Sequence, residues 1–205
     1  MIILGVIISY LVGSIPTAYI FGKCYKGIDI RQHGSGNIGA TNVFRVLGKV
    51  PGIIVLLLDI LKGVVAVAFV ADILGLVEII HRLILALCVV SGHNWTIFLK
   101  FKGGKGIATS LGVLIGLTIK IVTIRPVLLA IISIWLICFL VSRIVSLSSI
   151  IAAIFLPIFM LITNQPIEII CLGVVFSIFV VVRHRPNIKR LFSGQEPRVP
   201  FFTKK

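Results

Sequence analysis

The chain has 205 residues, of which 59% are hydrophobic and only 13% are charged. Together with a mean hydropathy of +1.19, this composition excludes a soluble globular domain and indicates an integral membrane protein. The length allows one helical bundle without an appended soluble domain, so we expect a single membrane-embedded domain, 1–205. The net charge of +14 is compatible with nucleic acid, anionic headgroups or an anionic substrate.

Apolar runs long enough to cross a bilayer recur along the chain. In order they lie near 2–22, 51–71, 79–99, 106–123, 126–142, 146–163 and 166–182. Continuous Ile/Val/Leu runs favour helices over the short alternating strands of a barrel. We therefore predict an all-α protein with seven transmembrane helices. Six or eight are the alternatives, because only Lys120 and Arg125 separate the fourth and fifth runs.

The basic residues predict the side of the membrane on which each loop lies. They gather after the first, third, fifth and seventh runs, whereas the alternate loops hold only Arg82, Lys120 and Arg125. By the positive-inside rule, the N-terminus is outside and the C-terminus is cytoplasmic, which requires an odd number of spans. Topology thus explains much of the net charge, and we expect no nucleic-acid partner.

The first polar cytoplasmic segment is GSGNIGATNVFRVLGK, Gly34 to Lys49. Its glycines let backbone amides approach a ligand closely, and its hydroxyl and amide side chains can hydrogen-bond that ligand. These residues are Gly34, Gly36, Gly39, Ser35, Asn37, Thr41 and Asn42. Arg45 adds a planar donor group suited to phosphate. The alternative is a re-entrant loop that only turns the chain.

The second segment, KGGKGIAT, places Gly103, Gly104 and Gly106 around Lys105, immediately before an apolar helix expected to begin near Ile107. A glycine turn that opens onto a helix N-terminus offers free amides and a positive dipole end to an anion. The Walker A spacing is not met, so a nucleotide P-loop is disfavoured. Upstream, His93 is interpreted as an interfacial anchor.

The third segment, RHRPNIKRLFSGQEPRV, follows the last span. His184 and Asn187 point the same way if a helical turn continues through Pro186, and Glu196 is expected to brace this basic segment. The alternative is a basic tail that only anchors to headgroups.

Two further features carry charge or hydroxyl groups. Asp59 and Lys62, spaced i, i+3 within an apolar run, predict a structural ion pair. Arg143 and Ser146 in the loop SRIVSLSS could contact a further phosphate, although a plain turn also explains them. The cysteines are scattered singly, so we expect no metal site and no cofactor.

Four stretches, GSIPTAYIFGK, HGSGNIGATNVFRVLG, GHNWTIFLKFKGGKGIAT and RHRPNIKRLFSGQE, closely resemble the bacterial acyl-phosphate:glycerol-3-phosphate acyltransferases, the PlsY family. The resemblance implies a seven-helix enzyme of the bacterial plasma (inner) membrane, with its active site on the cytoplasmic side. Such an enzyme moves a fatty acyl group from long-chain acyl phosphate to the sn-1 hydroxyl of glycerol 3-phosphate. Lysophosphatidic acid and inorganic phosphate are then the products, in the first step of phospholipid synthesis.

Residue roles follow from the same resemblance. It implies that Ser35 and Arg45 serve the active site, that the glycines around Lys105 form the acyl-phosphate pocket, and that His184 and Asn187 are a functional pair. It makes Glu196 structural. Ser146 matches a family serine in the loop after the fifth helix, but Ser142 is an alternative match.

The expected chemistry is a direct attack of the glycerol hydroxyl on the acyl carbonyl, without a covalent acyl-enzyme. Acyl phosphate is already activated, so orientation and charge neutralisation by Lys105, Arg45 and glycine amides can supply most of the acceleration. The proton acceptor is either His184 or a substrate phosphate oxygen. Ser35 is favoured as a phosphate ligand over a nucleophile because no acid/base partner is evident for it.

The donor and the partners are also predicted. The H-x-x-x-x-D signature of other glycerol-phosphate acyltransferases is absent, so acyl-CoA is disfavoured as donor. We expect a monomer in contact with membrane lipid, to which a soluble enzyme that forms acyl phosphate could hand over the donor. The rival function is a small transporter for a phosphorylated solute, but the chain shows no internal repeat. A non-enzymatic lipid-binding scaffold would not explain two phosphate-type loops.

Overall fold

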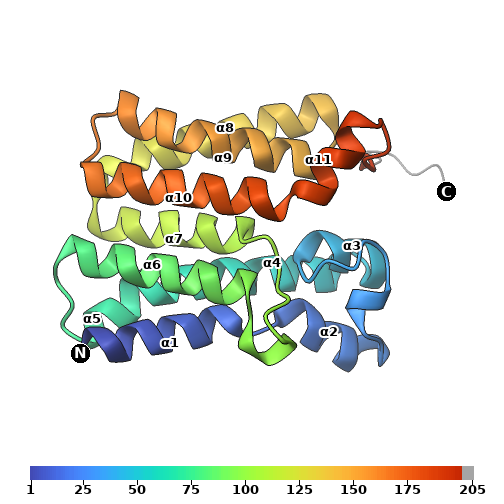
Figure 1. Cartoon of the computed structure of the whole chain (residues 1–205), viewed down its shortest axis with the longest axis horizontal. Helices are drawn as coiled ribbons and strands as arrows, with labels where there is room; N and C mark the ends of the chain where they lie inside the picture. The colour runs from blue at the N-terminus through green and yellow to red at the C-terminus, as the bar shows by residue number, and fades with distance from the viewer. Residues whose placement is uncertain (200–205) are drawn as a thin grey trace. The chain divides into compact units, whose positions relative to one another are not determined.

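The computed structural model describes residues 1–199, in which every regular element is helical (Figure 1). The chain divides into two compact units, Met1–Val122 and Thr123–Lys205. The prediction of an all-α membrane protein is confirmed, whereas the single domain stays a prediction.

The first unit contains two pairs of packed helices and the loops between them. Its elements are α1 (Ile2–Ser14), α2 (Thr17–Lys26), η1 (Ile30–Gln32), α3 (Ala40–Leu47), α4 (Lys49–Val64), the π-helical η2 (Val65–Val70), α5 (Ala71–Ile73), α6 (Ile79–Asn94), η3 (Ile97–Leu99) and α7 (Ile107–Lys120). Helix α1 packs along α6, and α4 packs along α7. Pro16 explains why α1 and α2 are separate helices, because Ile15 before it takes an extended conformation.

Glycines allow both helix pairs to approach closely. A Cβ built on Gly13 of α1 would collide with the carbonyl of Val89 in α6. In the other pair, a Cβ on Gly63 of α4 would collide with the carbonyl of Thr109, and one on Gly112 of α7 with that of Ile60. Small residues at helix crossings are the usual device for packing helices in lipid, where the hydrophobic effect does not drive helix association.

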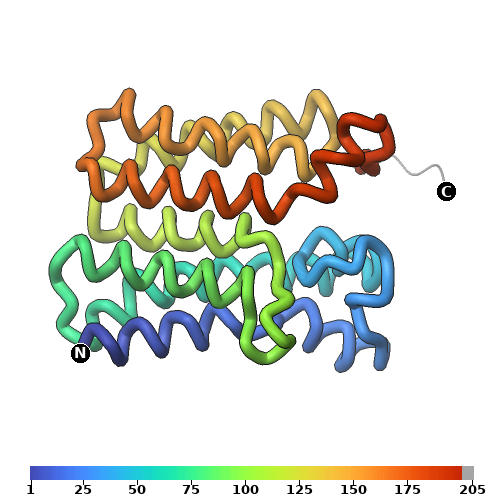
Figure 2. The backbone as a smooth tube through the Cα atoms, in the orientation of Figure 1, coloured from blue at the N-terminus to red at the C-terminus, as the bar shows by residue number. Residues whose placement is uncertain are grey.

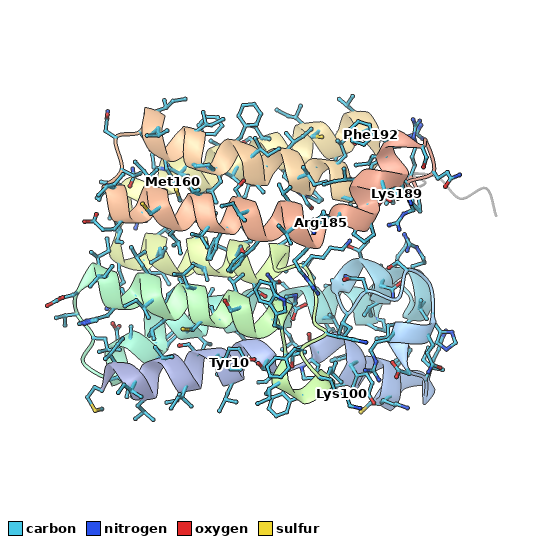
Figure 3. The ribbon with its side chains drawn as sticks, in the orientation of Figure 1. Tyr10, Lys100, Met160, Arg185, Lys189 and Phe192 are labelled. Carbon is cyan, nitrogen blue, oxygen red and sulfur yellow. The ribbon has the colours of Figure 1, made fainter. Side chains whose placement is uncertain are left out.

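The second unit is built around α9. Its helices are α8 (Arg125–Ser142), α9 (Val145–Ile162), α10 (Ile167–Arg183) and α11 (Arg185–Phe192), preceded by the short η4 (Val122–Ile124). Helix α9 contacts both α8 and α10. Trp135 of α8 donates a hydrogen bond to Ser149 of α9 at 3.2 Å, and Gly173 of α10 packs against Met160 of α9, which is labelled in Figure 3.

Helices occupy all seven stretches that hydropathy predicts as spans. Five of them are long and apolar enough to cross a membrane: Ile2–Lys26, Lys49–Ile73, Ile79–Leu99, Val122–Ser142 and Val145–Ile162. The pair α10 and α11, bent by 61°, can supply a sixth. Helix α7 is apolar but has only 14 residues. Among the described residues the structure therefore supports five or six spans, and the predicted seventh and the orientation stay predictions.

Candidate functional site

The loop of the first polar segment is held by the buried side chain of Asn42. This side chain accepts a hydrogen bond from the backbone N–H of Ser35 at 2.8 Å and donates one to the carbonyl of His33 at 3.0 Å. Gly34 and Gly36 have φ values of 61° and 69°, which glycine adopts without strain. The amide of Asn42 thus shapes the loop, and direct contact of Asn42 with substrate stays a prediction.

The other polar groups of this segment remain accessible. Ser35, Thr41 and Arg45 are exposed, whereas Gly36 and Asn37 are partly buried. Thr41 and Arg45 lie one turn apart on α3 and therefore share a face of that helix. Val43 and Leu47 anchor the opposite side of α3 in the core. The loop thus exposes the hydroxyl of Ser35, and α3 exposes the hydroxyl of Thr41 and the guanidinium of Arg45.

The second segment forms the predicted glycine turn, Gly103 to Gly106, at the start of α7. Gly103 N–H donates to the carbonyl of Asn94 at 3.2 Å, and Gly104 N–H donates to that of His93 at 2.9 Å. Gly106 has a φ of 81° and α7 begins at the next residue, as predicted. Lys105, inside the turn, is partly buried. The amides at the start of α7, which directly follow Lys105 in the chain, offer a positive potential to an anion.

The chain between α6 and this turn is fastened to α1. Figure 2 shows it leaving α6, folding into a loop and returning into α7. Tyr10 Oη donates to the carbonyl of Trp95 at 2.7 Å, and Thr96 Oγ1 donates to that of Ser14 at 2.5 Å. Figure 3 labels Tyr10 on α1 and Lys100 in the loop. These bonds fix the loop that carries the second segment.

The first and second segments meet at Gly104. A Cβ on this residue would lie 2.7 Å from the carbonyl oxygen of Ile38, in the first segment, and would collide with Nε2 of His93. A small polar pocket surrounds the meeting point; it is lined by Gly13, Ser14, Ile15, Pro16, Thr17, Ile38, Lys62, His93, Thr96, Gly103 and Gly104. The two glycine-rich segments, which are about 70 residues apart in the sequence, therefore form one site in the first unit.

A buried charge cluster lies at this pocket. Nζ of Lys62 is 2.8 Å from Oδ1 of Asp59, so the structure contains the predicted ion pair. Thr17 Oγ1 donates to the same oxygen at 2.7 Å, and His93 Nδ1 lies 3.7 Å from it. The interpretation of His93 as an interfacial anchor is wrong, because its side chain is only 8% exposed. Periodicity could not reveal this cluster, since its members come from α2, α4 and α6.

Three polar side chains that the sequence analysis did not single out are buried near the start of α7. Asn94 is fully buried, and neither its Oδ1 nor its Nδ2 has a hydrogen-bond partner among the described residues; the same holds for the hydroxyls of Thr109 and Ser110. A Cβ on Gly106 would lie 2.8 Å from Oδ1 of Asn94. Buried polar groups normally have partners, so these atoms indicate a place suited to a polar ligand or water.

An apolar groove adjoins the polar pocket. It has a volume of about 290 Å³ and is lined by Val12, Ile15, Thr17, Ile20, Phe21, Leu58, Leu61, Lys62 and Val65. Ile15, Thr17 and Lys62 line both the groove and the polar pocket. The two cavities of the first unit therefore share three lining residues, and the apolar groove adjoins the point where the glycine-rich segments meet.

In the second unit, Glu196 binds three side chains. It accepts hydrogen bonds from Ser146 at 2.7 Å, Asn187 at 2.6 Å and Arg190 at 2.7 Å. Burial opposes ionisation of Glu196, but these three donors outweigh it and hold the pKa of Glu196 below its usual value. Two predicted site residues, Ser146 and Asn187, are thus positioned by the residue that was expected to be structural.

The remaining residues of the third segment and the α8–α9 loop have local partners. Helix α10 ends at Arg183 and α11 begins at Arg185, so the break lies at His184 and the first turn of α11 runs through Pro186. His184 is 3% exposed, and its Nδ1 lies 2.8 Å from the carbonyl of Val180. Ser142 Oγ, the alternative to Ser146, donates to the carbonyl of Cys138 at 2.7 Å.

Arg143 has a φ of 59°, its side chain is exposed, and its carbonyl accepts the N–H of Val199 at 2.8 Å. Among the residues that the structure describes, no group of three His, Cys, Asp or Glu side chains could hold a metal ion.

Comparisons with known proteins give one consistent result. A family model described as glycerol-3-phosphate acyltransferase matches residues 3–194. Proteins of that name from Desulforamulus reducens and Staphylococcus haemolyticus are each 46% identical to this chain; the alignments cover 97% of it and 94% and 98% of the relatives.

Two crystal structures of PlsY (YgiH), an integral membrane glycerol 3-phosphate acyltransferase, are similar in fold. The glycerol 3-phosphate form has a TM-score of 0.87 and the lysophosphatidic acid form 0.84, both at 38% identity. Each match covers 97% of this chain, and 96% and 95% of the respective PlsY chains.

Proposed function

Because the chain belongs to the glycerol-3-phosphate acyltransferase family, we propose that it transfers a fatty acyl group from acyl phosphate to the sn-1 hydroxyl of glycerol 3-phosphate. The products are lysophosphatidic acid and inorganic phosphate. The PlsY structures, in glycerol 3-phosphate and lysophosphatidic acid forms, support the proposed acceptor and product.

The observation that carries the proposal is the meeting of the two glycine-rich segments at Gly104. Both substrates carry a phosphate, so the reaction needs two groups of anion ligands near one another. We assign the amides of Gly103, Gly104 and Gly106 with Lys105 to the donor phosphate, and Ser35 with Arg45 to the acceptor. The adjoining apolar groove supports a donor whose acyl chain stays in lipid.

The proposed step is direct. The sn-1 oxygen attacks the acyl carbonyl, the new ester C–O bond forms, and the bond between the carbonyl carbon and the phosphate oxygen breaks. Inorganic phosphate leaves with the electron pair, and Lys105 and the amides neutralise its charge. Ser35 serves as a ligand rather than a nucleophile, because its contact with Asn42 is made by its backbone N–H and no described residue pairs with its hydroxyl as a general base.

The hydroxyl proton passes to His184 or to a phosphate oxygen of the substrate. The contact between Nδ1 of His184 and the carbonyl of Val180 supports the first acceptor, since a proton on Nδ1 leaves Nε2 as the basic nitrogen. The roles of Asn187, Ser146 and Arg143 as further ligands rest on the sequence resemblance. The contacts of Glu196 with Ser146 and Asn187 support a positioning role for Glu196.

For the membrane arrangement we propose seven spans, with α7 as the shortest and with α10 crossing by itself. The N-terminus is then outside, and the polar segments face the cytoplasm of a bacterium, where glycerol 3-phosphate is dissolved. Agreement between the odd count and the basic loops supports this topology. The proposed enzyme is a monomer in contact with membrane lipid. It needs no cofactor and receives acyl phosphate from a soluble enzyme.

The test is product formation by purified protein in lipid, supplied with long-chain acyl phosphate or acyl-CoA and with glycerol 3-phosphate. We expect lysophosphatidic acid only with acyl phosphate. Lys105→Ala should lower the rate by about a hundredfold or more, because one preorganised charge contact is lost. Lys102→Ala changes an exposed lysine of the same loop and should keep most of the activity. If folded protein forms no product but vesicles take up glycerol 3-phosphate, the chain is a transporter.

A further inference from the structure

The Asp59–Lys62–His93 cluster is not accounted for by stability. The three side chains are 2%, 5% and 8% exposed, within helices of two apolar spans. Removing two charges from water costs about as much as their attraction returns, and apolar replacements of buried pairs are often neutral or stabilising. Inside a membrane, ionisable residues are generally functional. The cluster therefore calls for a second explanation besides packing.

The histidine of the cluster bears directly on the glycine turn. Its carbonyl accepts the N–H of Gly104 at 2.9 Å, and its Nε2 occupies the place where a side chain on Gly104 would be. The next residue, Asn94, accepts the N–H of Gly103. The glycine turn thus packs against the end of α6 and is hydrogen-bonded to it. The imidazole of His93 is the side chain nearest to Gly104.

The carboxylate acts on the opposite nitrogen of the same ring. Oδ1 of Asp59 is 3.7 Å from Nδ1 of His93, and Thr17 and Lys62 hold that oxygen from other directions. Because the imidazole is rigid, an anion on its Nδ1 side determines where Nε2 lies. Lys62 balances the charge of Asp59, which lets a carboxylate exist at this depth.

We infer that His93 is a positioning residue for the donor phosphate, held by Asp59 and acting through Gly104. This inference rests on the proposed function. In this arrangement the cluster determines the position of Gly104 relative to Lys105 and to the amides at the start of α7. A displacement of about 1 Å in such a site can cost on the order of a hundredfold in rate. The rival explanation is an ion pair that only joins α4 to its neighbours.

The double substitution Asp59→Asn with Lys62→Met distinguishes the two explanations. It removes both charges together, so no unpaired charge is left in the membrane, and the new amide can still accept the bond from Thr17. If the pair is only structural, the double variant behaves as the wild type does. If Asp59 holds His93, the KM for acyl phosphate should rise on the order of tenfold, while the KM for glycerol 3-phosphate stays within about twofold.

Two further variants of the first unit sharpen the test. His93→Leu should raise the KM for acyl phosphate as the double variant does, and His93→Gln, which keeps a polar group beside Gly104, should restore part of it. The control is Lys120→Met, which removes one cationic partner of Asp72 while Arg82 still pairs with that carboxylate. Asp72 follows η2, and none of these three residues lines the pocket at Gly104. The control variant should leave both KM values unchanged.

A measurement that does not depend on activity completes the experiment. Hydrogen exchange of the amides of residues 103 to 106 should be faster in the Asp59/Lys62 double variant than in the wild type, at equal melting temperatures. Unchanged exchange and unchanged KM for acyl phosphate would overturn the inference. A wild type that makes no lysophosphatidic acid would instead overturn the proposed function, and the exchange data would still report whether the cluster holds the turn.

Discussion

Gly104 is where the geometry of single atoms matters most, because two other chain segments approach it without room for a side chain. The carbonyl of Ile38 and the imidazole of His93 both lie where a Cβ on this residue would be. Its backbone conformation is one that other residues also adopt, since it is absent from the positive-φ glycines. The requirement for glycine is therefore one of space and not of backbone strain.

Replacing Gly104 with alanine should consequently displace the loops and not unfold the protein. We expect the kcat/KM for acyl phosphate to fall by about tenfold or more, because the new methyl group must push His93 or Ile38 aside. Gly5→Ala is the control, since Gly5 is also buried but faces only the flexible ends of leucine side chains. Steady-state kinetics of both variants would decide, and an unaltered Gly104→Ala enzyme would contradict the close packing.

Sequence reasoning could locate the glycine turn of the first unit but not its contacts. The turn before α7 was predictable because the spacing of the glycines before an apolar helix is local information. The engagement of Asn42 by Ser35 and His33, and the role of His93, depend on the loop conformation and on distant helices. The ion pair of Asp59 and Lys62 was predictable because its partners are one helical turn apart, whereas Thr17 comes from another helix.

At the scale of elements, the crossing of α4 and α7 supports the start of α7. Gly63 and Gly112 bring the backbones of α4 and α7 together near the start of α7. The packing against α4 therefore holds the first turns of α7, which directly follow the glycine segment. Hydropathy located all of these helices within a few residues, because apolar length is a local property. It could not indicate which helices pair, since small residues are scattered through most of the runs.

Gly112→Ala should therefore lower the melting temperature, because the added methyl group would collide with the carbonyl of Ile60. We expect a cost of about 1–3 kcal/mol from overpacking. Ile119→Ala, which changes an exposed residue of the same helix, should have little effect. Thermal unfolding in one detergent compares the two, and equal melting temperatures would show that the crossing can relax without cost.

In the second unit, Glu196 ties α9 to α11, and this tie should depend on pH. The folded state holds the pKa of Glu196 below its usual value, so the unfolded state binds the proton more readily. The stabilisation is then complete above about pH 4.3, the usual glutamate pKa, and is lost as the pH falls through the lower pKa of the folded state.

Glu196→Gln isolates this contribution from the other carboxylates. Near pH 7 we expect the variant to be less stable by about 2 kcal/mol, since hydrogen bonds to a charged group are lost. The difference from the wild type should shrink as the pH falls below 4. Melting temperatures of both proteins across that range are the measurement, and a difference that stays constant with pH would contradict an ionised Glu196 in the folded state.

For the molecule as a whole, the basic loops and an odd number of spans predict one orientation in the membrane, which can be tested. With seven spans, a reporter active only in the cytoplasm should fluoresce when fused to the C-terminus. A reporter active only outside should work when fused before α1. Both results follow from the positive-inside rule. If the reporters at both ends were active outside, the number of spans would have to be even.

The short α7 has a consequence for the lipid around the protein. Fourteen residues extend about 21 Å, whereas the hydrocarbon core of a bilayer is about 30 Å thick. This hydrophobic mismatch of about 9 Å requires the bilayer to thin beside α7, or one end of α7 to lie below the headgroups. In the proposed topology, a recessed start of α7 would place the glycine turn close to acyl-chain depth, where a water-soluble acceptor and a lipid-borne donor can meet.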